Sequence, residues 1–171
     1  MKTVHYGWQQ QFRELYDKAM VKYRNEHRNV DTLLTSREVN VLKSFGAKPM
    51  ELYDFAEDSS DLDWETALLI TATRRDYFLV VQHAQLSSTT LTMDKFPAKD
   101  AELAGIPWLP RLIQKAQGRL RGELPDELMY CCGGDRKFFR KYDIHPADFM
   151  RVVWATKGNE EKILPYVQGE R

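Results

Sequence analysis

Two adjacent cysteines, followed by two glycines and an aspartate, form the stretch of this chain whose residue types could do chemistry. Cys131 and Cys132 are the only cysteines, and Gly133-Gly134 is the only Gly-Gly pair. The glycines predict a turn, and Asp135 is predicted to be the N-cap of the helix that follows. A sulfur atom just before the positive end of a helix dipole lies where a thiolate or a bound anion is favoured. The stretch is therefore a candidate site.

Cys132 suits two roles. As a nucleophile or redox thiol it would be activated by Arg136 or Lys137 and assisted by His145 or Lys115. The commoner role of a free cysteine is that of a small, buried, apolar residue. His145 fits equally well as part of the cap of the next helix. The sequence leaves both interpretations open and makes Cys132 and His145 the catalytic candidates.

A second set of residues suits the binding of a small anionic or polar ligand. Arg111, Lys115 and Arg119 recur one helical turn apart, which suits gripping a phosphate or carboxylate beside the backbone N–H groups of the glycine turn. The alternatives are a solvated helix flank, or a bidentate bridge from Arg111 to Asp135. An arginine in a mostly apolar helix, such as Arg75, needs a carboxylate partner or lines a pocket. The candidate ligand-binding residues are Arg111, Lys115, Tyr130, Asp135 and Arg75.

Metal binding is not expected. Cys131, Cys132, His145 and His83 lack the Cys-x-x-Cys or His-x₃-His spacing of structural zinc sites. The acidic run 58–65 lacks the central glycine and the final glutamate of an EF-hand loop, so it is interpreted as a solvated helix cap. We expect no metal and no cofactor.

Composition and charge narrow the class of protein. The chain has 171 residues, with 25 basic and 25 acidic side chains, so no net field draws it to nucleic acid. No uncharged apolar run approaches the ~20 residues of a membrane helix. The first residues lack the apolar core of a signal peptide. A disulfide between adjacent cysteines would be strained and would link no distant parts of the chain, so the thiols are expected to be reduced. These features predict a cytoplasmic protein that binds neither nucleic acid nor membranes; a homodimer is left open.

Helical periodicity dominates the first half. Apolar residues spaced three and four apart predict a helix over about 8–26, and Thr35 with Glu38 forms a capping-box signature for the next one. Pro49 suits the first turn of a third helix, and Asp63 begins a long apolar fourth. Residues 77–81 are rich in β-branched and aromatic types. Helix is the favoured interpretation there, with a small β-hairpin near 77–93 as the alternative.

The second half is also predicted to be helical. A connecting segment over 85–104 leads to a helix that starts near Pro107 and Pro110 and ends at Gly122, with further helices after Gly134, from Pro146 and from Asn159. The fold class is therefore mainly α, with seven or eight helices in a compact, bundle-like arrangement. An N-terminal lobe (1–84) and a C-terminal unit (105–171) are expected to pack as one domain.

The C-terminal part resembles a family of bacterial proteins known as domain of unknown function 5069. The resemblance lies in Gly105-Ile106-Pro107-Trp108-Leu109-Pro110-Arg111, in the segment 130–139 and in 144–149. The positions that match the family's motifs are Arg111, Lys115, Tyr130, Cys132, Asp135 and Phe138. Cys131 and the two glycines stand where many relatives have Asn and Pro-Leu. The resemblance implies a mostly helical unit, and no activity.

Three functions follow from these observations. The first is the binding of a small anionic or polar ligand in a pocket between the two lobes. The second is an enzyme that uses Cys132 as a nucleophilic or redox thiol. The third is a protein–protein interaction module that uses an exposed helix such as 8–26.

Overall fold

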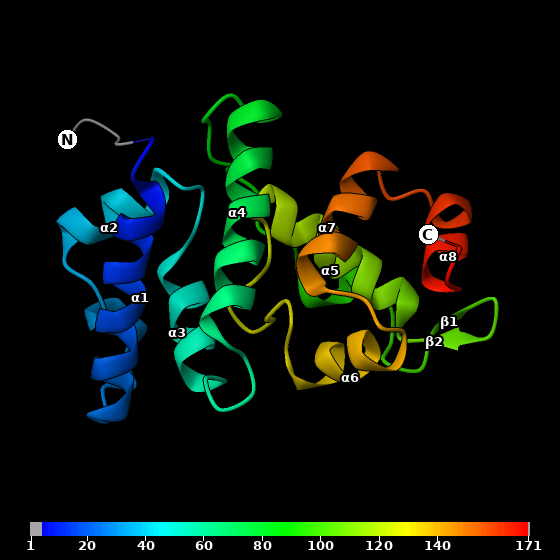
Figure 1. The fold of residues 1–171 in the computed structure, drawn as a ribbon, viewed down its shortest axis with the longest axis horizontal. Coiled ribbons are helices and arrows are strands. Elements are labelled where there is room, and N and C mark those ends of the chain that lie inside the picture. The colour runs from blue at the N-terminus through cyan, green and yellow to red at the C-terminus, as the bar shows by residue number, and fades with distance from the viewer. Residues whose placement is uncertain (1–4, 171) are drawn as a thin grey trace. The chain divides into compact units, whose positions relative to one another are not determined.

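The structure is a computed structural model that describes residues 5–170. The chain divides into two compact units, Met1–Leu86 and Ser87–Arg171. In the two units together, the described residues form eight α-helices, two 3₁₀ turns and one two-stranded hairpin (Figure 1). The prediction of a mainly α protein with seven or eight helices is confirmed.

The first unit contains four α-helices and one 3₁₀ turn. They are α1 (Trp8–Arg24), η1 (Val30–Thr32), α2 (Ser36–Lys43), α3 (Pro49–Glu57) and α4 (Trp64–Val80). Pro49 occupies the first turn of α3, and the Asp63 carboxylate caps α4 by accepting from the Thr66 N–H at 2.7 Å. Asp63 thus acts as the helix cap that the acidic run predicted.

Aromatic rings fill the core of the first unit. Helix α1 packs on α3 and α2, and its apolar face is buried. The Phe12 ring stacks on Trp64 with centroids 5.6 Å apart and meets Phe45 edge-on at 6.4 Å. Such pairs contribute about 0.5–1.5 kcal/mol each beyond the area they bury. Because this face is used inside the unit, α1 does not offer it to a partner protein.

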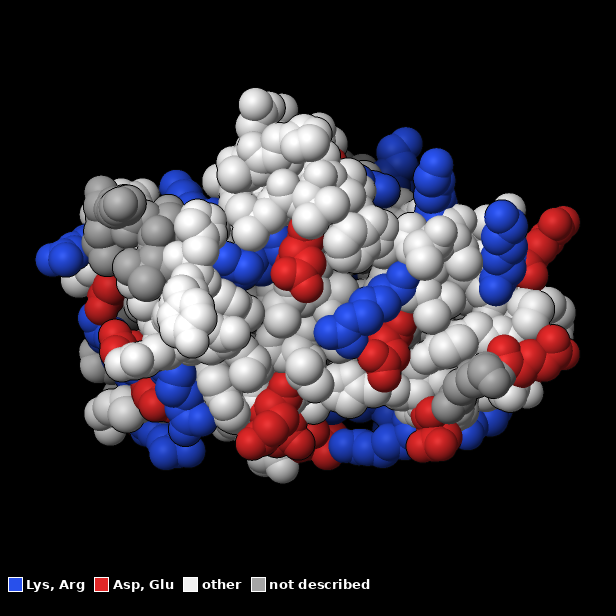
Figure 2. All heavy atoms as spheres, turned by 45° about the horizontal axis from the view of Figure 1, so that its top comes forward, with Lys and Arg blue, Asp and Glu red and all other residues white. Residues whose placement is uncertain are grey.

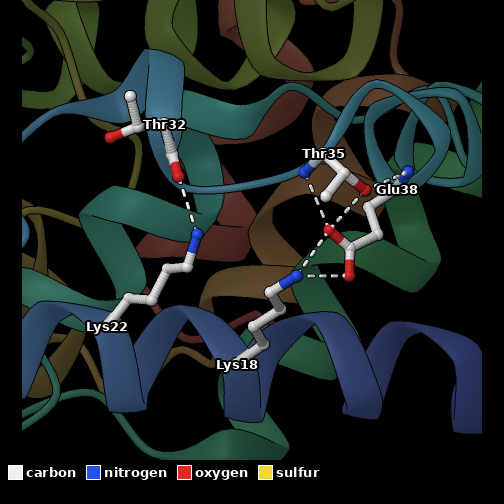
Figure 3. Close-up of polar contacts among 5 residues, drawn as sticks. All are labelled: Lys18, Lys22, Thr32, Thr35 and Glu38. Carbon is white, nitrogen blue, oxygen red and sulfur yellow. Dashed lines mark hydrogen bonds and ion pairs between the residues drawn. The ribbon is translucent and has the colours of Figure 1, made fainter.

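The start of α2 is held by a capping box with an added cation. The Glu38 carboxylate accepts from the Thr35 N–H at 2.8 Å, and the Thr35 hydroxyl accepts from the Glu38 N–H. Lys18 Nζ donates to both oxygens of the same carboxylate, at 2.6 and 2.7 Å (Figure 3). Lys22, one turn along α1, donates to the Thr32 carbonyl at 2.7 Å. The two lysines therefore tie α1 to the segment that leads into α2.

Replacing Glu38 with glutamine tests this arrangement. Partial burial works against the charge, but hydrogen bonds from Lys18 and Thr35 outweigh it and lower the pKa of Glu38 from 4.5 to about 2. A depressed folded-state pKa stabilises the fold above the unfolded value and loses this effect as pH falls through the folded one. At pH 7 we expect Glu38→Gln to lower the free energy of unfolding by about 1–2 kcal/mol. The difference should shrink between about pH 5 and pH 2.

Urea denaturation of both proteins across that pH range is the measurement. Glu14→Gln is the matched control, because Glu14 is an exposed carboxylate on α1 of the same unit. A Glu38→Gln difference that stays constant down to pH 2 would show that the charge of Glu38 has no part in it.

Helix α4 settles the alternative left open near residues 77–93. It runs continuously to Val80, and the Val81 N–H bonds to the Tyr77 carbonyl at 2.9 Å. The favoured helix is confirmed, and the hairpin does not form there. The hairpin lies instead at β1 (Glu102–Leu103) and β2 (Ile106–Pro107), within and just after the segment 85–104. Its turn contains Ala104 and Gly105 at φ 50° and 75°, the geometry that a tight two-residue turn needs.

The second unit holds the hairpin and four α-helices. In order these elements are η2 (Met93–Lys95), β1, β2, α5 (Leu109–Arg121), α6 (Gly133–Lys141), α7 (Pro146–Ala155) and α8 (Glu160–Val167). Helix α5 packs against α7 and β1. The rings of Phe138, Phe139 and Phe149 meet edge-on in the core of this unit.

The cationic flank of α5 is buried, so the alternative of a solvated helix flank does not hold. Arg111, Lys115 and Arg119 are 7%, 0% and 3% exposed. Burial lowers the pKa of Arg119 to about 9. A cation in the interior needs hydrogen-bond acceptors around it. Arg111 and Lys115 each have such an acceptor within the second unit.

The face of the molecule in Figure 2 shows basic and acidic side chains interspersed, with no continuous patch of either sign. This agrees with the balance of 25 basic and 25 acidic residues. Within residues 5–170, none of the helices has the length and apolar character needed to cross a bilayer.

Candidate functional site

Asp135 is the centre of a buried polar cluster in the second unit. Its side chain is 0% exposed. Oδ1 accepts from Trp108 Nε1 at 2.9 Å, and Oδ2 accepts from the Cys131 N–H at 2.8 Å and from Lys115 Nζ. We call Trp108, Lys115, Cys131, Cys132 and Asp135 the Asp135 cluster. Three hydrogen-bond donors therefore meet on one buried carboxylate.

The position of Asp135 differs from the prediction. The N-cap of α6 is Cys132, the two glycines are the first helical residues, and Asp135 is the third. Its carboxylate reaches back to the Cys131 N–H, as the acidic residue of a capping box reaches back to the start of its helix. The prediction failed by one helical turn because glycines were taken to form the turn rather than the helix.

Lys115 connects the carboxylate to a sulfur atom. It projects from α5, is completely buried, and donates from Nζ both to Asp135 and to Cys132 Sγ, the latter at 3.3 Å. The carboxylate balances the ammonium charge, so the pair is neutral as a unit. Sulfur is a weak acceptor as a thiol and a much better one as a thiolate.

The two neighbouring thiols lie in different surroundings. Cys131 is fully buried, and burial together with the Asp135 charge raises its pKa to about 12. Cys132 is half-buried and stands at the N-terminal end of α6, whose dipole favours negative charge there. Of the two, Cys132 is the half-buried residue with a cation in contact.

Two residues of the cluster have strained backbones. Trp108 and Cys131 lie in the left-handed region at φ 72° and 70°, where residues other than glycine are uncommon. Each such residue costs on the order of 1–3 kcal/mol and persists only where its surroundings hold it in place. Both residues donate hydrogen bonds to Asp135, which supplies that constraint.

Gly134 allows the Trp108 indole to lie against the first turn of α6. A Cβ at this position would stand 2.6 Å from Trp108 Cζ2 and 2.9 Å from Cη2, closer than carbon atoms pack. Its neighbour Gly133 has only Arg136 Nη2 near it, at 3.7 Å. One glycine of the pair is therefore needed for close packing.

Arg111 does not form the predicted bridge to Asp135. Its Nη1 donates to the Pro97 carbonyl at 2.7 Å, and its guanidinium lies 5.9 Å from the Phe96 ring centroid. Lys115, one turn further along α5, takes the carboxylate instead. Both residues lie on the same side of the helix, and the position of α6 decides which one reaches Asp135.

Tyr130 and His145 are used within the second unit. The Tyr130 hydroxyl donates to the Pro146 carbonyl at 2.7 Å, and burial raises its pKa well above the usual value. His145 is the N-cap of α7, where its Nδ1 accepts from the Ala147 N–H at 3.1 Å. No hydrogen bond joins His145 to Cys132 within residues 5–170. The basic group in contact with Cys132 is therefore Lys115, one of the two assistants predicted.

Arg75 belongs to the first unit, apart from the other candidates. Its Nη2 lies 3.1 Å from His5 Nδ1, and its guanidinium lies 5.0 Å from the Trp8 ring centroid. Burial lowers its pKa. The adjacent Arg74 donates to the Gly46 carbonyl at 2.8 Å and to Gln82 Oε1 at 2.6 Å. Both arginines contribute to the packing of that unit.

Trp108 was not among the predicted site residues, because aromatic side chains such as this one mostly fill the core. The signal that could have found it is the glycine pair. A glycine inside a helix, where no special backbone angle is needed, indicates close approach of another group. In residues 5–170, no group of three or more His, Cys, Asp or Glu side chains could hold a metal ion.

Comparisons with family models, with curated proteins and with solved structures found no match for this chain. The resemblance of its C-terminal part to domain of unknown function 5069 therefore stays a prediction. Any functional assignment has to come from the geometry of the Asp135 cluster.

Proposed function

We propose that this protein acts through Cys132 as a nucleophilic, redox-active thiol. The observation that supports this most is the 3.3 Å contact between Lys115 Nζ and Cys132 Sγ, made by an ammonium that has no access to water. The contact places a buried cation against the sulfur, at the N-terminal end of α6. The reaction class is attack of the thiolate on a soft electrophile such as a peroxide, a disulfide or an alkylating agent.

The alternative of a ligand pocket has less support. The ligand-binding set included Arg111, Lys115 and Tyr130, and each of these side chains is already bonded to the protein itself. A ligand would compete with a backbone carbonyl for Tyr130 and for Nη1 of Arg111, and with the carboxylate for Lys115. The thiol function requires no such exchange, because Cys132 is a half-buried residue of the cluster.

Alkylation of the native chain tests the proposal. Iodoacetamide at pH 7, followed by peptide mass spectrometry, should modify Cys132 and spare Cys131, whose thiol is buried and has a pKa of about 12. The rate constant for Cys132 should exceed that of the same residue in the urea-unfolded chain at least fivefold, because the ammonium and helix end act only in the fold. A Cys132 that reacts more slowly in the fold than in urea would overturn the proposal.

Lys115→Met/Asp135→Asn is the informative variant. It removes both buried charges together, so no isolated charge is left in the interior, and the asparagine can still accept from Trp108. We expect Cys132 in this variant to lose most of its rate advantage. Lys141→Met is the control: Lys141 is an exposed residue of α6 outside the cluster, and its removal should leave the labelling of Cys132 unchanged.

A further inference from the structure

We propose that oxidised Cys132 forms a covalent sulfur–nitrogen bond with Lys115. This inference rests on the proposed reactivity of Cys132 and adds the fate of its oxidised form. The chain has only two cysteines, and the other one is the buried neighbour. A disulfide between adjacent residues is strained. The nucleophile that already touches Cys132 Sγ is the Lys115 amine, 3.3 Å away.

The first step consumes a peroxide. The Cys132 thiolate attacks one peroxide oxygen, the S–O bond forms as the O–O bond breaks, and the leaving hydroxide or alkoxide takes up a proton. Sulfur is oxidised by two electrons to a sulfenic acid, and the peroxide is reduced to water or an alcohol. Cys132 is half-buried as a residue, which leaves the peroxide a way to approach it from solvent.

The second step needs no further oxidant. The Lys115 ammonium passes a proton to Asp135, with which it shares a hydrogen bond in the buried cluster. The free amine then attacks the sulfenic sulfur, the N–S bond forms as the S–O bond breaks, and hydroxide leaves and becomes water with a proton from the amine. The product is a sulfenamide, and the chain has lost two hydrogen atoms overall.

The geometry favours this step over hydrolysis or further oxidation. Reacting atoms about 3–3.5 Å apart are close to the attack distance, and high effective concentrations follow from such placement. The Lys115 stem is a flexible four-carbon chain, so the amine can follow the sulfur without moving α5. Asp135 remains held by the Trp108 indole and the Cys131 N–H while it carries the proton.

The bond would make the cluster a reversible redox switch. It joins α5 to α6 covalently and removes the positive charge of Lys115 from the interior. A small thiol such as dithiothreitol attacks the sulfur of a sulfenamide, releases the amine and restores both side chains. Further oxidation of Cys132 is blocked while the bond lasts.

The experiment treats the full-length protein with hydrogen peroxide, blocks remaining thiols and digests it with trypsin. We expect a crosslinked species that joins the peptide 112–119, left uncut at Lys115, to the peptide 122–136, with the loss of two hydrogens. Dithiothreitol should release both peptides. Lys141→Met, which removes an exposed lysine of α6 outside the cluster, should retain the crosslink, and Lys115→Met/Asp135→Asn should abolish it.

Three other outcomes would overturn the inference. Loss of two hydrogens confined to the peptide 122–136 would place the bond on the Gly133 amide or on Cys131. A crosslink that carries an additional oxygen atom would identify an N–O–S bridge and reject the direct N–S bond. A Cys132 that alkylates fast and is oxidised by peroxide without any crosslink would refute the switch while leaving the proposed thiol function intact.

Discussion

Replacing Asp135 with alanine is expected to lower the free energy of unfolding by about 3–5 kcal/mol, the effect of removing one partner of a buried ion pair. The variant leaves the Lys115 ammonium in the interior without its carboxylate. It also removes the acceptor of the Trp108 indole N–H and of the Cys131 backbone N–H. These two residues have strained backbones that the carboxylate holds in place. Urea denaturation at pH 7, followed by circular dichroism, measures the loss.

The control for this prediction is Asp126→Ala. Asp126 is an exposed carboxylate of the same unit, and its removal should change stability by no more than about 0.5 kcal/mol. The double variant Lys115→Met/Asp135→Asn should be more stable than Asp135→Ala, because it buries no unpaired charge. If Asp135→Ala costs less than the double variant, the ion pair does not hold the site together.

Gly134→Ala is expected to destabilise the protein by about 1–3 kcal/mol, although alanine is normally the better helix residue. The new Cβ would stand 2.6 Å from Trp108 Cζ2, so either the indole or the first turn of α6 has to move. Movement of the indole breaks its hydrogen bond to Asp135. The thermal unfolding midpoint should therefore fall, and Cys132 should lose part of its alkylation rate.

Gly133→Ala provides the matched control within the same helix turn. Its Cβ would meet nothing closer than Arg136 Nη2 at 3.7 Å. The substitution should be neutral or stabilise the protein by up to about 1 kcal/mol, since alanine loses less backbone entropy than glycine. Equal effects of the two substitutions would mean that contact with Trp108 is not what requires Gly134.

Helix existence could be predicted from the sequence because its signals are local. The Thr35–Glu38 box, Pro49, Asp63 and Asn159 lie at the starts of the helices they predict. Each signal depends on hydrogen bonds or backbone angles within a few residues. The hairpin at 102–107 was not predicted, because strands of two residues are too short to show an alternating apolar pattern.

The candidate site could be predicted only in part, because the contacts within it depend on how helices pack and not on local sequence signals. Cys132 and Lys115 were both singled out by residue type, and the structure brings them into contact. The choice between Arg111 and Lys115 as partner of Asp135 depends on how α6 lies on α5. The burial of all three cations on α5 is likewise a property of tertiary packing, since the same spacing is typical of a solvated helix face.

The hydrogen bonds of the Asp135 cluster close short loops of the chain, and this lowers the entropic cost of holding its two strained backbones in place. The hydrogen bonds of the cluster join residues that are 4, 17, 20 and 27 positions apart. The entropy lost on closing a loop grows only with the logarithm of its length, and contacts between near neighbours in sequence form readily during folding. The left-handed backbones of Trp108 and Cys131 are thus set by contacts that cost little chain entropy. All of these contacts lie within Ser87–Arg171, so the cluster can assemble from one continuous stretch of chain.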